Sequence, residues 1–251
     1  VLRLFKLVKQ SNGFVLLFPD VNNPKELSKH VLYEKISKIF LESSQWARIL
    51  NIDTVGTLNE RICKGELSNI IRINEALHEK KIVSIADSIT EQNKKIVLIA
   101  GPSSSGKTTF SHRLAIQLRV NGLNTHIISI DDYYKNQTKT PGFEEEFDFE
   151  SLDAIDVKQL NSDLFRLING DVVNIPSFNF VTGKREYKDN YIEIDSNDII
   201  LLEGIHGLNE QISYGIPDEM KYKVFISALT QLNVDDHNRI PTTDTRIIRR
   251  I

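Results

Sequence analysis

The stretch Gly101-Pro102-Ser103-Ser104-Ser105-Gly106-Lys107-Thr108 decides the fold of this chain. It fits the pattern G-x-x-x-x-G-K-S/T, the phosphate-binding loop, in which backbone N–H groups and a helix N-terminus bind a polyphosphate. Ile96 to Ala100 is an all-apolar run typical of a buried parallel strand, and apolar residues follow the loop at helical spacing. Strand, loop and helix in this order predict a nucleoside-triphosphate site. The structural alternative is a serine-rich surface turn.

The loop supplies the side chains and backbone groups that we expect to bind ATP. These residues are Gly101, Ser103, Ser104, Ser105, Gly106, Lys107, Thr108 and Thr109. In this motif the lysine reaches the β- and γ-phosphates, and the hydroxyl of the last residue ligates Mg²⁺. We therefore assign Lys107 to the phosphates and Thr108 to the metal.

Length and composition are those of a globular protein with one large domain or two small ones. The chain has 251 residues and a formal net charge of −3, which argues against a general nucleic-acid or membrane surface. Its single cysteine, Cys63, excludes an intrachain disulfide and fits a reducing cytosol, and no apolar run reaches the length of a membrane span. We expect a cytoplasmic protein, and the sequence leaves its oligomeric state open, a homo-oligomer included. Because residue 1 is Val and the only methionine is Met220, we also expect a fragment or a processed product.

A polar stretch at residues 91–94 predicts a boundary between two parts, residues 1–92 and 93–251. The first part reads as a β-hairpin around Asn12-Gly13, followed by helices. Three helices are expected. The first covers residues 32–50, the second starts at a capping box formed by Thr57 to Glu60, and the third covers residues 66–90. Beyond the boundary, strands and helices alternate. This alternation predicts an α/β fold of the P-loop NTPase type, a parallel sheet with helices on both faces. Residues 184–194 alternate in polarity like a solvent-facing hairpin.

Acidic residues follow two of the predicted parallel strands. The strand at 125–130 ends in Asp131-Asp132, and the strand at 198–202 ends in Glu203. In open α/β sheets ligands bind beyond the carboxyl ends of the strands, so these carboxylates lie on the side of the phosphate loop. Glu203 is placed to hold Mg²⁺ directly or through water; a helix cap is the alternative. Asp131 is the candidate general base and Asp132 the runner-up, with helix capping or a turn as the alternative for both.

The last predicted helix opens at Pro241 and carries Arg246, Arg249 and Arg250. Their spacing places all three on one helix face, where they suit the charge that develops during phosphoryl transfer. A solvated or salt-bridged helix face is nearly as good an interpretation.

Six segments taken together, in order, resemble the uridine kinase/phosphoribulokinase family of phosphate-loop kinases. They are the phosphate loop and residues 129–134, 147–150, 175–180, 203–207 and 244–246. The resemblance covers residue 95 to the end of the chain. The N-terminal part, chiefly residues 46–59 and 75–82, resembles the longer bacterial nucleoside kinases, which carry a threonyl-tRNA-synthetase-like region ahead of the kinase.

The resemblance implies ATP and Mg²⁺ as cofactors and assigns roles to individual residues. It implies Asp131 as the base, Tyr134 in the substrate pocket, Thr108 and Glu203 at the metal, and Arg250 near the phosphates or the substrate; Arg246 is counted with the substrate-binding residues. Glu150 stands where animal uridine–cytidine kinases have an aspartate for the ribose hydroxyls. Phe178 and Gly183 replace a tyrosine and a histidine on the pyrimidine, so the nucleobase can stack on Phe178, but the polar contacts that select it are not visible.

The function predicted from these residues is transfer of the γ-phosphoryl group of ATP to the 5′-hydroxyl of uridine or a related nucleoside. Two alternatives remain: a kinase for another small hydroxyl compound, of the phosphoribulokinase or pantothenate kinase type, and a nucleotide-binding regulatory module. The family continues past the last helix with an arginine-bearing lid and another strand. We therefore expect these 251 residues alone to bind nucleotide but to turn over slowly.

Overall fold

The computed structural model describes residues 4–10, 13–27, 34–136, 148–228, 232–235 and 238–248. The chain divides into two compact units, Val1–Asp53 and Thr54–Ile251. This division lies upstream of the boundary expected at residues 92 and 93. The reason is that the last turns of the long helix α3 (Leu67–Glu91) bury Ile82, Ala86 and Ile89 in the core of the second unit.

The described residues of the first unit form two small antiparallel sheets and a helix. Strand β1 (Lys6–Gln10) pairs with β2 (Gly13–Leu17), and β3 (Pro19–Asp20) pairs with β4 (Asn23–Leu27). Helix α1 (Glu34–Ile49) follows. The predicted hairpin is confirmed, with Gln10 opposite Gly13, although Asn12 of its turn lies outside the described residues.

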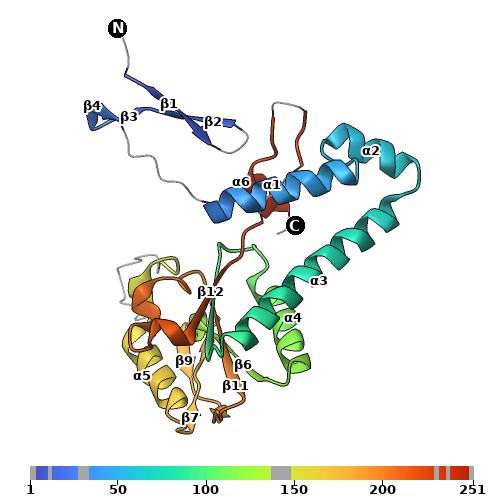
Figure 1. The fold of residues 1–251 in the computed structure, drawn as a ribbon. Coiled ribbons are helices and arrows are strands. Elements are labelled where there is room, and N and C mark those ends of the chain that lie inside the picture. The colour runs from blue at the N-terminus through green and yellow to red at the C-terminus, as the bar shows by residue number, and fades with distance from the viewer. Residues whose placement is uncertain are drawn as a thin grey trace. The chain divides into compact units, whose positions relative to one another are not determined.

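Four parallel strands form the central sheet of the second unit, in the order β12-β5-β11-β6 (Figure 1). Their bounds are Ile96–Ala100 for β5, Asn124–Ser129 for β6, Asp198–Glu203 for β11 and Lys221–Phe225 for β12. Every residue of β5 and β11 is buried, as expected for central strands covered on both faces. The predicted α/β class with a parallel sheet is confirmed.

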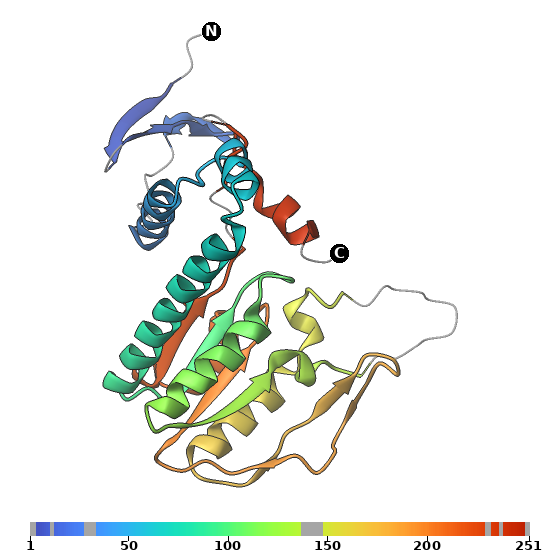
Figure 2. The same ribbon diagram turned by 90° about the vertical axis from the view of Figure 1, so that its right-hand side faces the viewer.

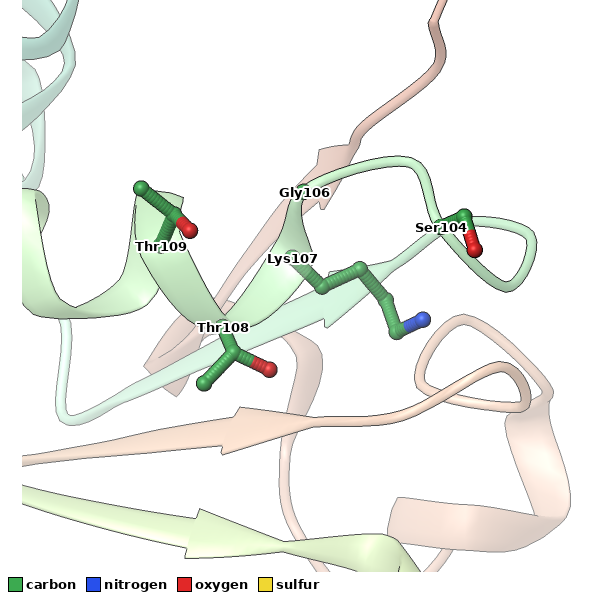
Figure 3. A pocket seen from close by; sticks show the side chains of 5 residues that line it. All are labelled: Ser104, Gly106, Lys107, Thr108 and Thr109. Carbon is green, nitrogen blue, oxygen red and sulfur yellow. The ribbon is translucent and has the colours of Figure 1, made fainter. Parts of the chain in front are cut away.

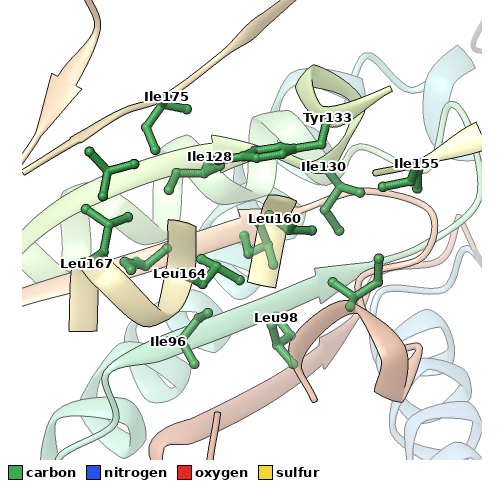
Figure 4. Packing of buried hydrophobic residues seen from close by; sticks show 14 of the residues in the cluster. Ile96, Leu98, Ile128, Ile130, Tyr133, Ile155, Leu160, Leu164, Leu167 and Ile175 are labelled. Carbon is green, nitrogen blue, oxygen red and sulfur yellow. The ribbon is translucent and has the colours of Figure 1, made fainter. Parts of the chain in front are cut away.

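Successive side chains of the central strands enter two different cores, because a strand points its side chains alternately to opposite faces. Ile96 and Leu98 of β5 pack with α5 (Val157–Ile168) on one face (Figure 4). Val97 and Ile99 pack on the other face with α3 and with α4 (Lys107–Val120). Figure 2 shows these helices on the two sides of the sheet. The sheet is therefore packed on both faces, and this packing fixes the positions of the residues at its carboxyl edge.

The short helix α2 (Val55–Cys63) begins earlier than the sequence suggested. Its N-cap is Thr54, whose side chain accepts a hydrogen bond from the backbone N–H of Thr57, and the Thr57 side chain bonds back to the Thr54 backbone. The prediction of a capping box starting at Thr57 is wrong, because two threonines three residues apart can form the reciprocal bonds and Thr57 takes the inner position. The predicted end is confirmed, since Lys64 is the C-cap and Gly65 has a φ of 78°.

Two further small antiparallel pairs lie in the second unit. Strand β7 (Val173–Asn174) pairs with β10 (Tyr191–Ile192), and β8 (Ser177–Asn179) pairs with β9 (Lys184–Glu186). The prediction of a hairpin within residues 184–194 is therefore wrong. Both of its strands pair with the preceding segment, because the chain already reverses between β8 and β9, where Gly183 has a φ of 65°.

The last described helix, α6 (Thr242–Ile248), begins after Pro241 as predicted. Across the part of the chain that the structure describes, no helix combines the length and the apolar character needed to cross a bilayer.

Candidate active site

The phosphate loop leaves β5 at a point where only glycine fits. A Cβ atom on Gly101 would lie 2.1 Å from the carbonyl oxygen of Ile226, just after the neighbouring strand β12. At the other end of the loop, Gly106 is the N-cap of α4 and has a φ of 95°, a conformation that L side chains rarely adopt. The two glycines of the motif thus shape the backbone rather than contact a ligand through side chains.

The loop encloses a cavity of about 270 Å³ lined by Ser104, Gly106, Lys107, Thr108 and Thr109. Figure 3 shows the ammonium group of Lys107 and the hydroxyl of Thr108 pointing the same way out of the first turn of α4. The first intrahelical bond of this helix runs from the N–H of residue 110 to the oxygen of Gly106, so the preceding N–H groups have no acceptor within the helix. Unpaired donors and the positive end of the helix dipole favour a bound anion.

Two polar groups of the loop lack the partners that a phosphate would supply. The hydroxyl of Ser105 is buried and has no hydrogen-bond partner among the described residues. Among the described residues, Lys107 donates only a long bond of 3.4 Å from its ammonium group, to the carbonyl of Pro102. Both observations fit a loop built to receive phosphate oxygens.

Glu203 lies at the end of β11, directly beside the loop strand β5. Its carboxylate Oε1 accepts a 2.9 Å hydrogen bond from the hydroxyl of Thr108, and the residue is only 8% exposed. Magnesium is usually held by one or two protein oxygens together with substrate phosphates, rather than by a full set of protein ligands. The described residues contain no cluster of three or more His, Cys, Asp and Glu side chains. The Thr108–Glu203 pair therefore fits an Mg²⁺ site that phosphates complete.

Asp131 follows β6 in the short 3-10 turn Ile130–Tyr133, at the same edge of the sheet as Glu203. Burial raises the pKa of Asp131, while the positive charges of Lys107 and His206 and the nearby Tyr134 hydroxyl oppose the rise. The turn starts directly after Ser129, which pairs with Glu203 in the sheet, so Asp131 lies on the segment next to the Thr108–Glu203 pair. A carboxylate with a raised pKa at this edge has the properties of a general base for a phosphate acceptor.

Asp132, the next residue along the chain, makes a contact with β8. Its Oδ1 atom accepts a 3.0 Å hydrogen bond from the backbone N–H of Phe178 in β8. Burial raises the pKa of Asp132 as well, and the bond from Phe178 opposes the rise. The side chain of Asp132 therefore joins the turn to β8.

Four aromatic rings gather beside this turn: Tyr134, Phe149, Phe178 and Phe180. Neighbouring rings pack mostly edge to face, with centroids 5.0 Å apart for Phe178 and Phe180 and 5.5 Å apart for Tyr134 and Phe178. The Tyr134 hydroxyl donates a 2.7 Å bond to the carbonyl of Phe149. Phe178 is only 5% exposed, whereas Phe180 is 59% exposed. The ring available for stacking is thus Phe180, which sequence reasoning did not single out; its place two residues after Phe178, in the turn that follows β8, was the available signal.

The comparisons with known proteins agree with this geometry. The model of the phosphoribulokinase/uridine kinase family matches residues 96–240, more than half of the chain. The chain belongs to this family.

A uridine kinase from Lactobacillus helveticus is 33% identical over 162 residues, 62% of this chain and 65% of that protein. A uridine kinase from Mycoplasma genitalium is 35% identical over 111 residues, 44% of this chain and 51% of that protein. The chain spans less than two thirds of the length of these relatives.

Among solved structures, one titled as a possible uridine kinase from Bacillus stearothermophilus aligns with 53% of this chain and 70% of its own. Its sequence identity is 24% and its TM-score is 0.42.

The remaining residues expected from the family's pattern lie at different distances from the loop. Arg246 of α6 reaches it, because its Nε atom donates a 2.9 Å bond to the carbonyl of Ser103. Glu150 is exposed, and its backbone oxygen accepts a 3.0 Å bond from Nε2 of His206. Arg249 and Arg250 lie outside the described residues. His206, which bonds to the Glu150 carbonyl, also opposes the rise in the pKa of Asp131 through its charge and belongs to the surroundings of the site.

Proposed function

We propose that this chain carries the nucleotide and acceptor sites of an ATP-dependent nucleoside kinase. The reaction is transfer of the γ-phosphoryl group of ATP to the 5′-hydroxyl of uridine or a related nucleoside. One observation carries the proposal: the phosphate loop, the Thr108–Glu203 pair and the turn that carries Asp131 lie at the same edge of the sheet. The relatives named uridine kinase support the substrate class.

The loop residues bind and orient the triphosphate. Backbone N–H groups at the start of α4 and the ammonium group of Lys107 contact phosphate oxygens, and the Ser105 hydroxyl finds its missing partner there. Thr108 and Glu203 hold Mg²⁺, which when bound neutralises charge on the phosphates. Arg246, which is bound to the loop at the Ser103 carbonyl, adds positive charge near the phosphates.

Asp131 accepts the proton of the acceptor. The 5′-oxygen forms a bond to the γ-phosphorus, the bond from that phosphorus to the bridging oxygen breaks, and the hydroxyl proton passes to the Asp131 carboxylate. Burial favours this transfer because it raises the pKa of Asp131 and makes the carboxylate a stronger base. The nearby charge of Lys107 keeps it ionised enough to act.

The aromatic cluster forms the acceptor pocket. Phe180 offers an exposed ring for the nucleobase, and Phe178 and Tyr134 each contact that ring edge to face. Glu150, next to Phe149, takes the ribose hydroxyls. The assignment of Arg250 to the phosphates or substrate remains a prediction from sequence.

For the whole protein we propose the long bacterial nucleoside kinase form. In it, residues 93–251 are the kinase domain, and residues 1–92 are the end of a threonyl-tRNA-synthetase-like region with linker helices. This proposal, and that of a cytoplasmic location, rest on sequence resemblance and on the single Cys63. The oligomeric state stays open.

An acceptor panel with γ-labelled ATP tests the proposed function. The panel holds uridine, cytidine, adenosine, ribulose 5-phosphate and pantothenate, and products are identified by chromatography against standards. We expect a labelled nucleoside 5′-monophosphate from uridine or cytidine, and calorimetric binding of the same nucleoside in the presence of an ATP analogue. Label on the sugar phosphate or pantothenate alone would contradict the nucleoside assignment. ATP binding without binding or phosphorylation of any acceptor would favour a regulatory module.

A further inference from the structure

We propose that Arg185 is a positioning residue, which clamps the β8–β9 hairpin to the turn that carries Asp131 and Tyr134. The proposal rests on the proposed function, because it concerns the acceptor side of the same site. According to this proposal, the contacts that hold the acceptor pocket in place are different from those that hold the phosphate loop.

The guanidinium group of Arg185 is used almost completely in backbone contacts. Nη2 donates to the carbonyl of Tyr133 at 2.8 Å and to that of Tyr134 at 3.0 Å, and Nε donates to the Tyr134 carbonyl at 3.2 Å. Nη1 donates to the carboxylate of Asp156 at 3.1 Å. The side chain is 12% exposed. A planar fork with several fixed donors suits this arrangement, and a lysine cannot reproduce it.

The two carbonyls bound by Arg185 belong to the residues that directly follow the Asp pair. The direction of the Asp131 and Tyr134 side chains depends on the path of this turn, so holding its carbonyls holds those side chains. Asp156, the third partner, is the N-cap of α5, and its backbone N–H donates a 2.9 Å bond to the Tyr133 carbonyl. Arg185 therefore ties three elements together at one point.

A second contact joins the same two elements at the other strand of the hairpin. Asp132 in the turn accepts the backbone N–H of Phe178 in β8, while Arg185 in β9 donates to the turn. The hairpin that presents Phe178 and Phe180 is thus attached to the turn through both of its strands. None of these contacts involves the phosphate loop, so we expect nucleotide binding to be independent of the clamp.

The experiment compares Arg185→Gln with Arg185→Lys and with a matched control, Arg166→Gln. Arg166 lies near the other end of α5, donates to the carbonyl of Val172 at 3.0 Å and pairs with Asp171 at 3.6 Å. It therefore makes contacts of the same kind away from the site. For each variant, calorimetry gives the dissociation constants of an ATP analogue and of uridine with that analogue bound. Initial rates give kcat and KM for both substrates.

We expect Arg185→Gln to lower kcat/KM for uridine on the order of 100-fold, since a displacement of about 1 Å at a reacting group has an effect of this size. The KM and the dissociation constant for the ATP ligand should change by less than about twofold, because the loop is untouched. Arg185→Lys keeps the charge but not the fork, and we expect it to show the same acceptor-selective loss. Arg166→Gln should leave both ligands unaffected.

Four results would overturn the proposal. They are unchanged uridine constants in Arg185→Gln, equal losses for uridine and the ATP analogue, full recovery in Arg185→Lys, and a matching loss in Arg166→Gln. The melting temperature of each variant without ligand reports whether it is folded, and if Arg185→Gln fails this check, Arg185→Lys decides by the same criteria. A wild-type chain that binds the ATP analogue but no nucleoside would instead refute the proposed function itself, and the clamp with it.

Discussion

Replacing each aspartate of the Asp131–Asp132 pair by asparagine separates their roles. Asparagine is close in size to aspartate but cannot accept a proton at neutral pH. If Asp131 is the base, Asp131→Asn loses the contribution of general base catalysis, about 100- to 10,000-fold in kcat. This corresponds to about 3–5 kcal/mol in the activation barrier.

The same change at Asp132 should have a small effect. The bond that this side chain makes is accepted by Oδ1 from the N–H of Phe178, and the asparagine oxygen can accept it as well. What is lost is the part of the bond due to the negative charge, about 1 kcal/mol, which corresponds to no more than about fivefold in rate. Asp132→Ala removes the acceptor and should be clearly worse than Asp132→Asn.

The assay is the initial rate of nucleoside monophosphate formation at saturating ATP and uridine, together with the dissociation constant of an ATP analogue. We expect Asp131→Asn to lose nearly all turnover while the binding constant stays within about threefold, because the phosphate contacts are intact. The reasoning is refuted if Asp132→Asn is the more damaging change, or if Asp131→Asn loses nucleotide binding and turnover to the same extent.

Three other predictions follow from the same contacts. Gly101→Ala places a methyl group against the carbonyl of Ile226. Overpacking of this kind should lower the free energy of unfolding by about 1–3 kcal/mol and weaken binding of the ATP analogue. An unchanged melting temperature and affinity would contradict this prediction. Thr108→Ala removes the donor to Glu203 and the proposed metal ligand. In a metal titration, the Mg²⁺ concentration that gives the half-maximal rate should rise about 10- to 100-fold. An unchanged Mg²⁺ concentration would count against the proposed metal site. Asp131→Asn should raise the melting temperature at neutral pH, because burial raises the folded-state pKa of Asp131 and its ionisation therefore costs stability; the gain should shrink as pH falls through that raised pKa, and a gain that grows in acid would have the wrong sign.

The phosphate loop and its two flanking elements could be predicted from the sequence because their signals are local. An all-apolar run, two glycines with a lysine, and a helical repeat lie within one continuous segment, and the structure forms β5 and α4 there. The meeting of Thr108 with Glu203 is not local, yet it follows from a general rule. Parallel strands bring their carboxyl ends to one edge, so an acid that ends a neighbouring strand approaches the loop.

What the sequence could not decide depends on partners that are far away along the chain. Asp131 and Asp132 are equivalent by pattern, and only the bond from Phe178 distinguishes them. The burial of Phe178 likewise results from rings contributed by three separate segments, so an aromatic residue that looked available for stacking became support for Phe180. Arg185 had no recognisable motif, because its partners are backbone carbonyls that any residue would offer.

The most direct test of the central claim is a crystal structure of the chain with a non-hydrolysable ATP analogue, Mg²⁺ and uridine. We predict a triphosphate in the loop of residues 101–108, with the metal at Thr108 and Glu203. The uridine 5′-oxygen should lie within about 3.2 Å of the Asp131 carboxylate and face the γ-phosphorus. An ordered uridine whose 5′-hydroxyl lies beside another group, or a triphosphate bound away from the loop, would contradict the proposal.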